Sequence, residues 1–157
     1  MVDREETTTA PKVTDAALRP FLGFNLRRAW NVIHADLVAT LEPLGLRMIT
    51  FSALTVIGEN PGLSQAQLAT ALSVERPNLV AVTDELSTRG LVTRERLASD
   101  RRTYALKLTA AGERLLARAT EAVRGHEAAL YEPLSDGERQ SLIAMLQKIE
   151  SKGTGRS

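Results

Sequence analysis

The residues best suited to chemistry in this sequence are cations gathered around one short segment. Between positions 89 and 107, six cationic side chains stand against two acidic ones, a local net charge of +4 in a chain whose formal net charge is +1. Cations at this density can meet the phosphates of a nucleic acid, although a solvated charged surface would have the same composition. The cations are Arg89, Arg94, Arg96, Arg101, Arg102 and Lys107, and the acids are Glu95 and Asp100.

Signatures of other chemistry are missing from the sequence. It has no cysteine, which excludes disulfides, thiolate metal sites and cysteine redox sensing. Its two histidines, His34 and His126, have no partners at metal-ligand spacing, and neither G-x-S-x-G, a P-loop nor G-x-G-x-x-G occurs. We therefore expect no enzyme activity, no metal and no cofactor. The first residues lack an apolar signal segment and no stretch could span a bilayer, so we expect a cytoplasmic protein.

A helix should lead into the basic segment. Leu79, Val82 and Leu86 recur at spacings of three and four, which predicts one apolar helix face that packs on a core. Gly90 follows Arg89, the order expected at a helix C-terminus, where a cation lies near the last carbonyls and glycine adopts positive φ. We therefore expect this helix to stop at Gly90.

Two strands should carry the cations. The segment 91–97 is rich in β-branched and alternating residues, and Tyr104, Leu106 and Leu108 place apolar side chains at every second position. The intervening segment 98–102 is too polar to be buried and suits a hairpin tip. A helix followed by a basic two-stranded hairpin is the outline of a winged helix-turn-helix, which indicates a DNA-binding protein.

A short capped helix completes this outline. Ser64-Gln65-Ala66-Gln67 is a capping-box pattern, in which the Ser64 hydroxyl accepts the Gln67 amide proton and the Gln67 side chain reaches back. The helix that it opens should end near Leu72, and a tight turn separates it from the helix that holds Leu79. A helix over 48–57 precedes both. This order is the helix-turn-helix motif.

The outer helices carry more apolar surface than one winged helix can cover. A helix from Asp15 to about Leu41, one capped by Thr109 and broken by Pro133, and one opened by a Ser135 capping box are expected. Their apolar faces are Leu22, Leu26, Ala29, Ile33 and Leu37 on the first; Leu116, Ala119, Val123 and Leu130 on the second; and Leu142, Met145, Leu146 and Ile149 on the third.

Apolar helix faces that are left uncovered usually pack against a second copy of the chain. The alternative is a monomer whose terminal helices fold back onto the core. A two-fold dimer would place two reading helices about 34 Å apart, one turn of duplex. The expected fold is mainly α with a small β-hairpin, a winged helix-turn-helix with N- and C-terminal dimerisation helices. We expect an arm over 1–14, one domain over 15–150 and a frayed tail over 151–157, with the winged helix at about 47–109 and dimerisation helices at about 15–42 and 109–150.

Several motifs resemble the multiple antibiotic resistance regulator (MarR) family. The resemblance extends over about 22–149 and implies a homodimeric winged-helix transcription regulator, often a repressor released from a palindromic operator by a small, frequently aromatic, effector. The motifs are Leu86-x-x-x-Gly90-Leu91-Val92, the wing signature Asp100-Arg101-Arg102 with Leu108-Thr109-x-x-Gly112, Leu44-Gly45-Leu46, and Ser64-Gln65-x-x-Leu68-Ala69.

The wing signature is chemically reasonable at a hairpin tip. Asp100 can pair with Arg102 and stiffen the tip, because a guanidinium matches a carboxylate. Arg101, or Arg102 itself, could then enter a narrow minor groove, with Arg94 and Arg96 near phosphates on the same hairpin. The alternative is a surface ion pair worth roughly 0–1 kcal/mol.

In the reading helix, the buried residues leave Asn78, Val80 and Ala81 on the other face. Asn78 could bond an adenine edge, and Val80 or Ala81 could meet a thymine methyl. Arg76 and Pro77 stand at the N-terminus, which enters the major groove. Val80 and Ala81 occupy positions where relatives often have polar or basic residues, which shifts the expected readout towards Arg76, Asn78 and the wing. Ser64 and Gln65 could clamp a phosphate or serve as caps alone.

An effector site is suggested by an aromatic pair in the first helix. Trp30 and His34 stand one turn apart, near Arg27 and Arg28, and Phe51 could approach from the next helix. The rings could stack an aromatic acid and an arginine could pair with its carboxylate. The alternative is that Trp30 and Phe51 are core residues and the arginines are solvated.

Two classes of function remain. The first is a ligand-responsive regulator that binds double-stranded DNA. The second is a winged-helix interaction module whose hairpin docks a protein and which has no operator. Salt dependence separates them, because the affinity for DNA falls steeply as phosphate contacts are screened.

Overall fold

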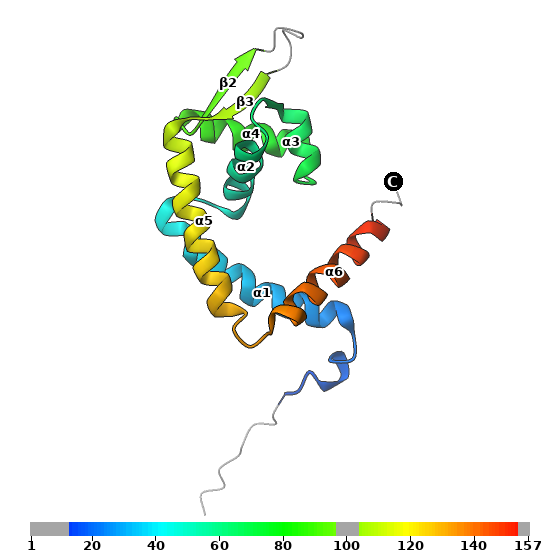
Figure 1. Ribbon diagram of the computed structural model, residues 1–157. Coiled ribbons are helices and arrows are strands. Elements are labelled where there is room, and N and C mark those ends of the chain that lie inside the picture. Colours follow the sequence, from blue (N-terminus) through cyan, green and yellow to red (C-terminus); the bar gives the residue numbers. More distant parts are fainter. Residues whose placement is uncertain (1–12, 97–103, 154–157) are drawn as a thin grey trace, which may run out of the picture. The chain divides into compact units, whose positions relative to one another are not determined.

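A computed structural model describes residues 13–96 and 104–153 (Figure 1). The chain divides into two compact units, Met1–His34 and Ala35–Ser157, and the single domain expected over 15–150 stays a prediction. The first unit holds a 3-10 turn, Ala16–Leu18, and the start of helix α1 (Leu22–Leu41). We expected this helix to begin at Asp15. It begins later because Arg19 ends the 3-10 turn and Pro20, which has no N–H, cannot donate the hydrogen bond that would continue it.

The second unit holds the winged helix-turn-helix and the two C-terminal helices. Helices α2, α3 and α4 pack together under the hairpin of β2 and β3, and α5 leads from the hairpin to α6 (Figure 1). After the end of α1 come a 3-10 turn (Glu42–Leu44), α2 (Met48–Glu59), β1 (Leu63–Ser64), α3 (Gln65–Ala71), α4 (Arg76–Thr88), β2 (Val92–Arg96), β3 (Tyr104–Leu108), α5 (Ala110–Leu130) and α6 (Asp136–Gly153).

The sheet contains a strand that the sequence did not predict. Its order is β1-β3-β2, and both pairs are antiparallel, with Leu63 opposite Leu106 and Arg94 opposite Leu106 on the other side. The strand β1 has only two residues, which is too short to show a periodic pattern. Because β3 is central and contacts α2, α3 and α5, Ala105 is buried as well as Leu106, whereas Tyr104 is 37% exposed.

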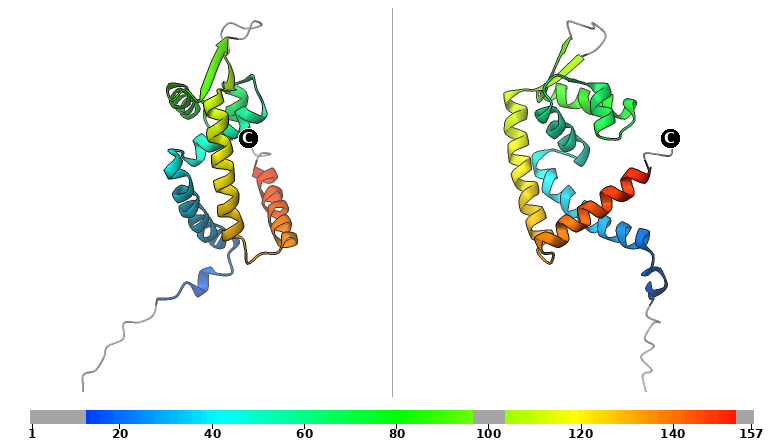
Figure 2. Two further views of the ribbon diagram at one scale, coloured as in Figure 1. Left: turned by 60° about the vertical axis from the view of Figure 1, so that its left-hand side comes forward. Right: turned by 45° about the vertical axis from the view of Figure 1, so that its right-hand side comes forward.

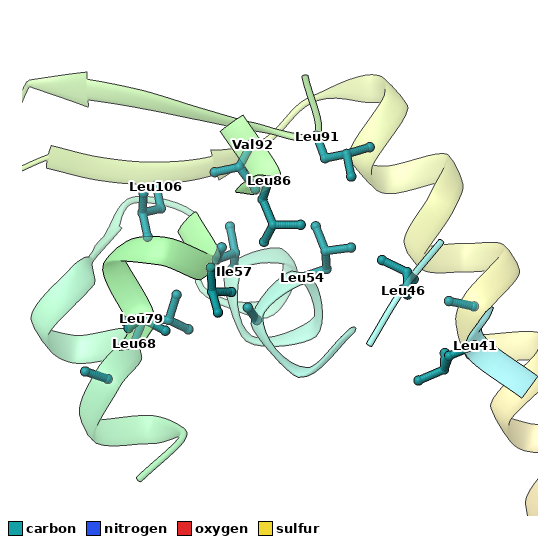
Figure 3. Close-up of a cluster of buried hydrophobic side chains, with 14 residues drawn as sticks. Leu41, Leu46, Leu54, Ile57, Leu68, Leu79, Leu86, Leu91, Val92 and Leu106 are labelled. Carbon is teal, nitrogen blue, oxygen red and sulfur yellow. The ribbon is translucent and has the colours of Figure 1, made fainter. Parts of the chain in front are cut away.

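The core of this unit is a cluster of aliphatic side chains from all the elements of the winged helix (Figure 3). The predicted inner face of α4, Leu79, Val82 and Leu86, is buried in it. The predicted edge of α5 is confirmed at Ala119, which is buried, and at Leu116 and Val123, which pack against the cluster. This core therefore fixes α4 by one face and leaves its other face at the surface.

A hydrogen-bonded joint connects the hairpin to α5. The Thr109 hydroxyl donates to the Gly90 carbonyl (2.7 Å) and accepts from the Gly112 amide (3.0 Å), and the Thr109 amide donates to the Leu91 carbonyl (3.0 Å). Gly112 lies so close that a Cβ on it would sit 2.1 Å from the Leu91 oxygen. The Leu-Thr-x-x-Gly motif is thus a joint that combines a helix cap with a close backbone approach.

Helix α6 begins as predicted and turns away from the end of α5 (Figure 2). The Ser135 amide donates to Glu138 Oε2 (2.8 Å), and the hydrogen bond from the Ser135 hydroxyl lowers the pKa of the Glu138 carboxyl. The helix runs on to Gly153, past the expected end at 150. Its apolar side chains are between 40% and 55% exposed: Leu142, Ile143, Met145, Leu146 and Ile149.

Among the described residues, no single helix is long and apolar enough to cross a membrane. One pair, Leu22–Leu44 with Met48–Glu59, meets the length and composition test only together, with a bend of 71° between them.

Candidate nucleic-acid interface

The exposed face of α4 carries the residues that the sequence assigned to base reading. Asn78 and Ala81 are exposed, and Val80 is exposed although it directly follows the buried Leu79. Pro77 stands in the first turn, where a missing N–H costs no helical hydrogen bond. The side chains of the first two turns are therefore available to a groove.

A cleft of about 270 Å³ lies where the N-termini of α3 and α4 meet the start of β3. It brings together four of the predicted residues: Ser64, Gln65, Arg76 and Val80. Tyr104 lines the cleft as well, although the sequence analysis assigned it to the apolar stripe of β3. Its position as the first residue of β3, next to the polar tip, was the signal that could have placed it at the surface. The cleft thus has cationic, amide, hydroxyl and aromatic groups on its walls.

Ser64 acts as the predicted cap. Its hydroxyl accepts from the Gln67 amide (3.2 Å), and its own amide donates to Gln67 Oε1 (2.8 Å). Gln65 is held too, because its Nε2 donates to the Thr83 hydroxyl on α4 (2.6 Å). In this structure both residues support the helix-turn-helix from within, and their part in phosphate binding stays a prediction.

Several cations of the basic segment have protein partners. Arg94 lies against α4, where its Nη2 donates to the Thr83 hydroxyl (3.1 Å) and pairs with Asp84. Lys107 pairs with Glu95 across the hairpin (2.8 Å).

Arg89 donates to the Gly45 carbonyl (2.8 Å) on the turn before α2. This hydrogen bond corrects the expectation that Arg89 meets the last carbonyls of its own helix. The side chain of Arg96, and all of Asp100, Arg101 and Arg102, lie outside the described residues, so the predicted minor-groove contact stays a prediction.

The predicted effector residues fall in both units. In the first, the rings of Trp30 and His34 lie 5.2 Å apart at an angle of 45°. The guanidinium carbons of Arg27 and Arg28 each lie 5.8 Å from the ring centre of Phe24. Phe24 was not among the predicted residues, although it stands three and four residues before these arginines in the sequence. Phe51, in the second unit, is half-buried against the core cluster.

His126 is the other histidine, and no role was predicted for it. It is buried in α5, and its Nδ1 contacts the carboxylate of Asp36 at the end of α1 that belongs to the second unit. Among the described residues, no group of three histidine or acidic side chains is placed to hold a metal ion.

Comparison with known proteins gives a consistent result. A model described as the MarR family matches residues 44–103. A transcriptional regulatory protein for the hcr operon of Thauera aromatica is 37% identical over 129 residues, which cover 82% of this chain and 78% of that protein. The structure of the transcriptional repressor CouR bound to a 23-mer DNA duplex shares 38% identity at a TM-score of 0.85 and covers 88% of this chain and 99% of its own. The structure of CouR bound to p-coumaroyl-CoA shares 36% identity at a TM-score of 0.78, and the match covers 88% of this chain and 98% of the CouR chain.

Proposed function

This chain belongs to the MarR family of DNA-binding transcriptional regulators, and we propose that it is a homodimeric repressor of a palindromic operator that a small aromatic ligand releases. The observation that carries the DNA-binding part is the exposed face of α4 beside the cleft. Arg76, Asn78 and Val80 offer a cation, a bidentate amide and an apolar group, which are the chemistries that read guanine, adenine and thymine edges.

The dimer is supported by the exposed apolar face of α6. Five aliphatic or thioether side chains on one helix make an uncovered surface that a water-soluble monomer rarely keeps. A second copy would cover it by an isologous contact. The two-fold axis of this contact would relate two α4 helices. These helices would then bind the two half-sites of a palindrome, one turn of duplex apart.

The ligand is supported by the CouR complex with p-coumaroyl-CoA and by the ring pair of α1. Trp30 and His34 offer faces on which a phenyl ring can stack. Arg27 and Arg28 are cations one turn before them and suit a carboxylate or the phosphates of a thioester. We therefore propose an aromatic acid or its coenzyme A thioester as the effector.

The DNA-binding function is tested by titrating the protein with a duplex of random sequence at several salt concentrations. If the protein contacts phosphates, the logarithm of its association constant should fall linearly with the logarithm of the salt concentration, with a slope of about −0.9 per contact. The alternative function, a winged-helix module that docks a protein, predicts no duplex binding even in dilute buffer, and that outcome would refute the proposal.

We expect Asn78→Ala to relax the preference at one base position by about 1–3 kcal/mol, because the Asn78 amide can donate to and accept from an adenine edge at once and alanine can do neither. The measurement is the profile of duplexes selected from a random pool by each protein. Ser87→Ala, at a half-buried position nearer the C-terminus of α4, is the control. Identical profiles for Asn78→Ala and the wild type would remove Asn78 from base reading.

We expect p-coumaroyl-CoA or p-coumarate to quench the fluorescence of Trp30, the one tryptophan of the chain, in a saturable manner. Calorimetry with the Trp30→Phe variant checks whether the ligand still binds when the reporter is gone. Saturable binding by calorimetry without any change in tryptophan fluorescence would place the ligand elsewhere, and no binding of either compound would contradict the assigned ligand class.

A further inference from the structure

One buried hydroxyl joins three elements of the candidate interface. The side chain of Thr83 has no exposed surface, and its hydroxyl donates to the Val80 carbonyl in α4 (3.0 Å). The same oxygen accepts from Gln65 of α3 (2.6 Å) and from Arg94 of β2 (3.1 Å). A hydroxyl has one donor and two acceptor sites, so this group is saturated. Its partners are the reading helix, the helix before it and the first strand of the wing.

Arg94 is held from a second side. The nitrogen that donates to Thr83 also pairs with the carboxylate of Asp84, the next residue of α4. The Arg94 side chain is 26% exposed, and its Nε is buried with no hydrogen-bond partner among the described residues. A partly desolvated guanidinium of this kind depends on the acceptors that it has, because an unmatched charge is costly. The cation is therefore directed inward, towards α4.

We propose that Thr83 and Asp84 are positioning residues, which act through Arg94 to fix the wing at one angle to the reading helix. The proposal rests on the DNA-binding function proposed above, and it replaces the expectation that Arg94 itself meets phosphate. Arg94 lies in the middle of β2 and pairs with Leu106 of β3. Bonds from Arg94 to α4 at this point restrain the two strands of the hairpin relative to the reading helix.

We call the bonds from Arg94 to Thr83 and Asp84 the brace. The benefit of this brace is preorganisation. A wing and a reading helix contact one duplex together only when their relative orientation matches the grooves. If the hairpin moves freely, each binding event must also order it, and that entropy is subtracted from the affinity. Gln65 extends the same restraint to α3, so one oxygen sets the relative positions of three DNA-facing elements.

The sharpest test is Asp84→Asn. If Asp84 anchors Arg94, the variant should bind DNA more weakly, and if Asp84 is only a surface charge, it should bind DNA more tightly. Asp84 is 55% exposed on the reading helix, so as a mere surface charge it repels phosphate, and neutralising it would strengthen DNA binding. As an anchor, its loss releases Arg94, and we expect binding about tenfold weaker. Glu75→Gln is the matched control. It makes the same charge change on the residue that precedes α4, where no side-chain cap bond is made within the described region, and should leave affinity equal or higher.

A second pair of variants separates positioning from general stability. Thr83→Val keeps the shape and removes the hydroxyl, whereas Thr83→Ser keeps the hydroxyl. We expect Thr83→Val to bind DNA more weakly. The slope of its log affinity against log salt should also be shallower, by about 0.9 for each phosphate contact of the wing that is lost. Thr83→Ser should restore both the affinity and the slope. A purely structural role would lower the melting temperature of Thr83→Val and leave the salt slope of the folded protein unchanged.

Amide hydrogen exchange of the free protein makes the test independent of DNA. Loss of the brace should speed exchange in β2 and β3 relative to α5 in both Asp84→Asn and Thr83→Val. If the wild type binds no duplex, the proposed function fails, and the exchange result alone decides on the brace. Tighter DNA binding by Asp84→Asn, or hairpin exchange equal to that of the wild type in both variants, would overturn the proposal.

Discussion

Gly112→Ala should destabilise the protein by about 3–5 kcal/mol, one of the largest effects expected of any single substitution here. A Cβ at this position would lie 2.1 Å from the Leu91 oxygen and 3.1 Å from its carbonyl carbon, and backbone atoms cannot rotate away as a side chain can. Helix α5 would have to shift from the base of the hairpin, and the hydrogen bonds of Thr109 would be lost with it. Urea unfolding followed by circular dichroism measures the change.

Gly125→Ala is the matched control for this prediction. Gly125 lies in the same helix, with nothing within 4 Å of its Cβ position among the described residues, so alanine should stabilise the helix by about 1 kcal/mol. The two substitutions are chemically identical, and we expect them to change the free energy of unfolding in opposite directions. Equal effects at both positions would contradict the close approach of α5 to Leu91.

Leu146→Glu combined with Ile149→Glu should break the proposed dimer and greatly weaken operator binding. Both side chains lie on the exposed apolar face of α6, and two carboxylates there would have to be buried without partners when a second copy docks. We expect dimerisation to weaken roughly a hundredfold or more. Sedimentation over a range of protein concentrations gives the monomer–dimer equilibrium directly.

The control variant is Ala144→Glu with Ser151→Glu, which adds the same two charges at exposed positions on the opposite side of α6. It should dimerise like the wild type. If both double variants keep the oligomeric state of the wild type, α6 does not form the interface.

Features that depend on near neighbours in the chain were predictable from the sequence. The caps at Ser64, Thr109 and Ser135 and the positive φ of Gly90 are each decided within about four residues, and the structure confirms all four. The start of α1 was the exception. The helix was expected from Asp15, but Pro20 has no N–H to donate, and α1 begins only at Leu22.

Features that depend on distant partners were not predictable. Arg94 and Lys107 have similar sequence surroundings in a basic segment, yet one is anchored to Thr83 and Asp84 on a helix and the other pairs across the hairpin. The strand β1 exists only because β3 offers an edge to Leu63. Composition indicated a cationic surface, and tertiary contacts decide which cations on it are available.

The exposed residues of the candidate site were predicted better than its supporting residues. Helical periodicity placed Asn78, Val80 and Ala81 on the open face of α4, because the opposite face must be buried. The same periodicity says nothing of Thr83, which lies next to the buried stripe and differs from a core residue only in its hydroxyl. Its importance follows from the three bonds made by that hydroxyl.

The most direct test of the account is selection of bound duplexes from a random pool by the purified protein, followed by sequencing. A dimer that reads with two α4 helices predicts an inverted repeat whose half-sites are centred about 10 base pairs apart. Enrichment of a single asymmetric half-site, or of no sequence at all, would contradict the claim that paired reading helices recognise DNA.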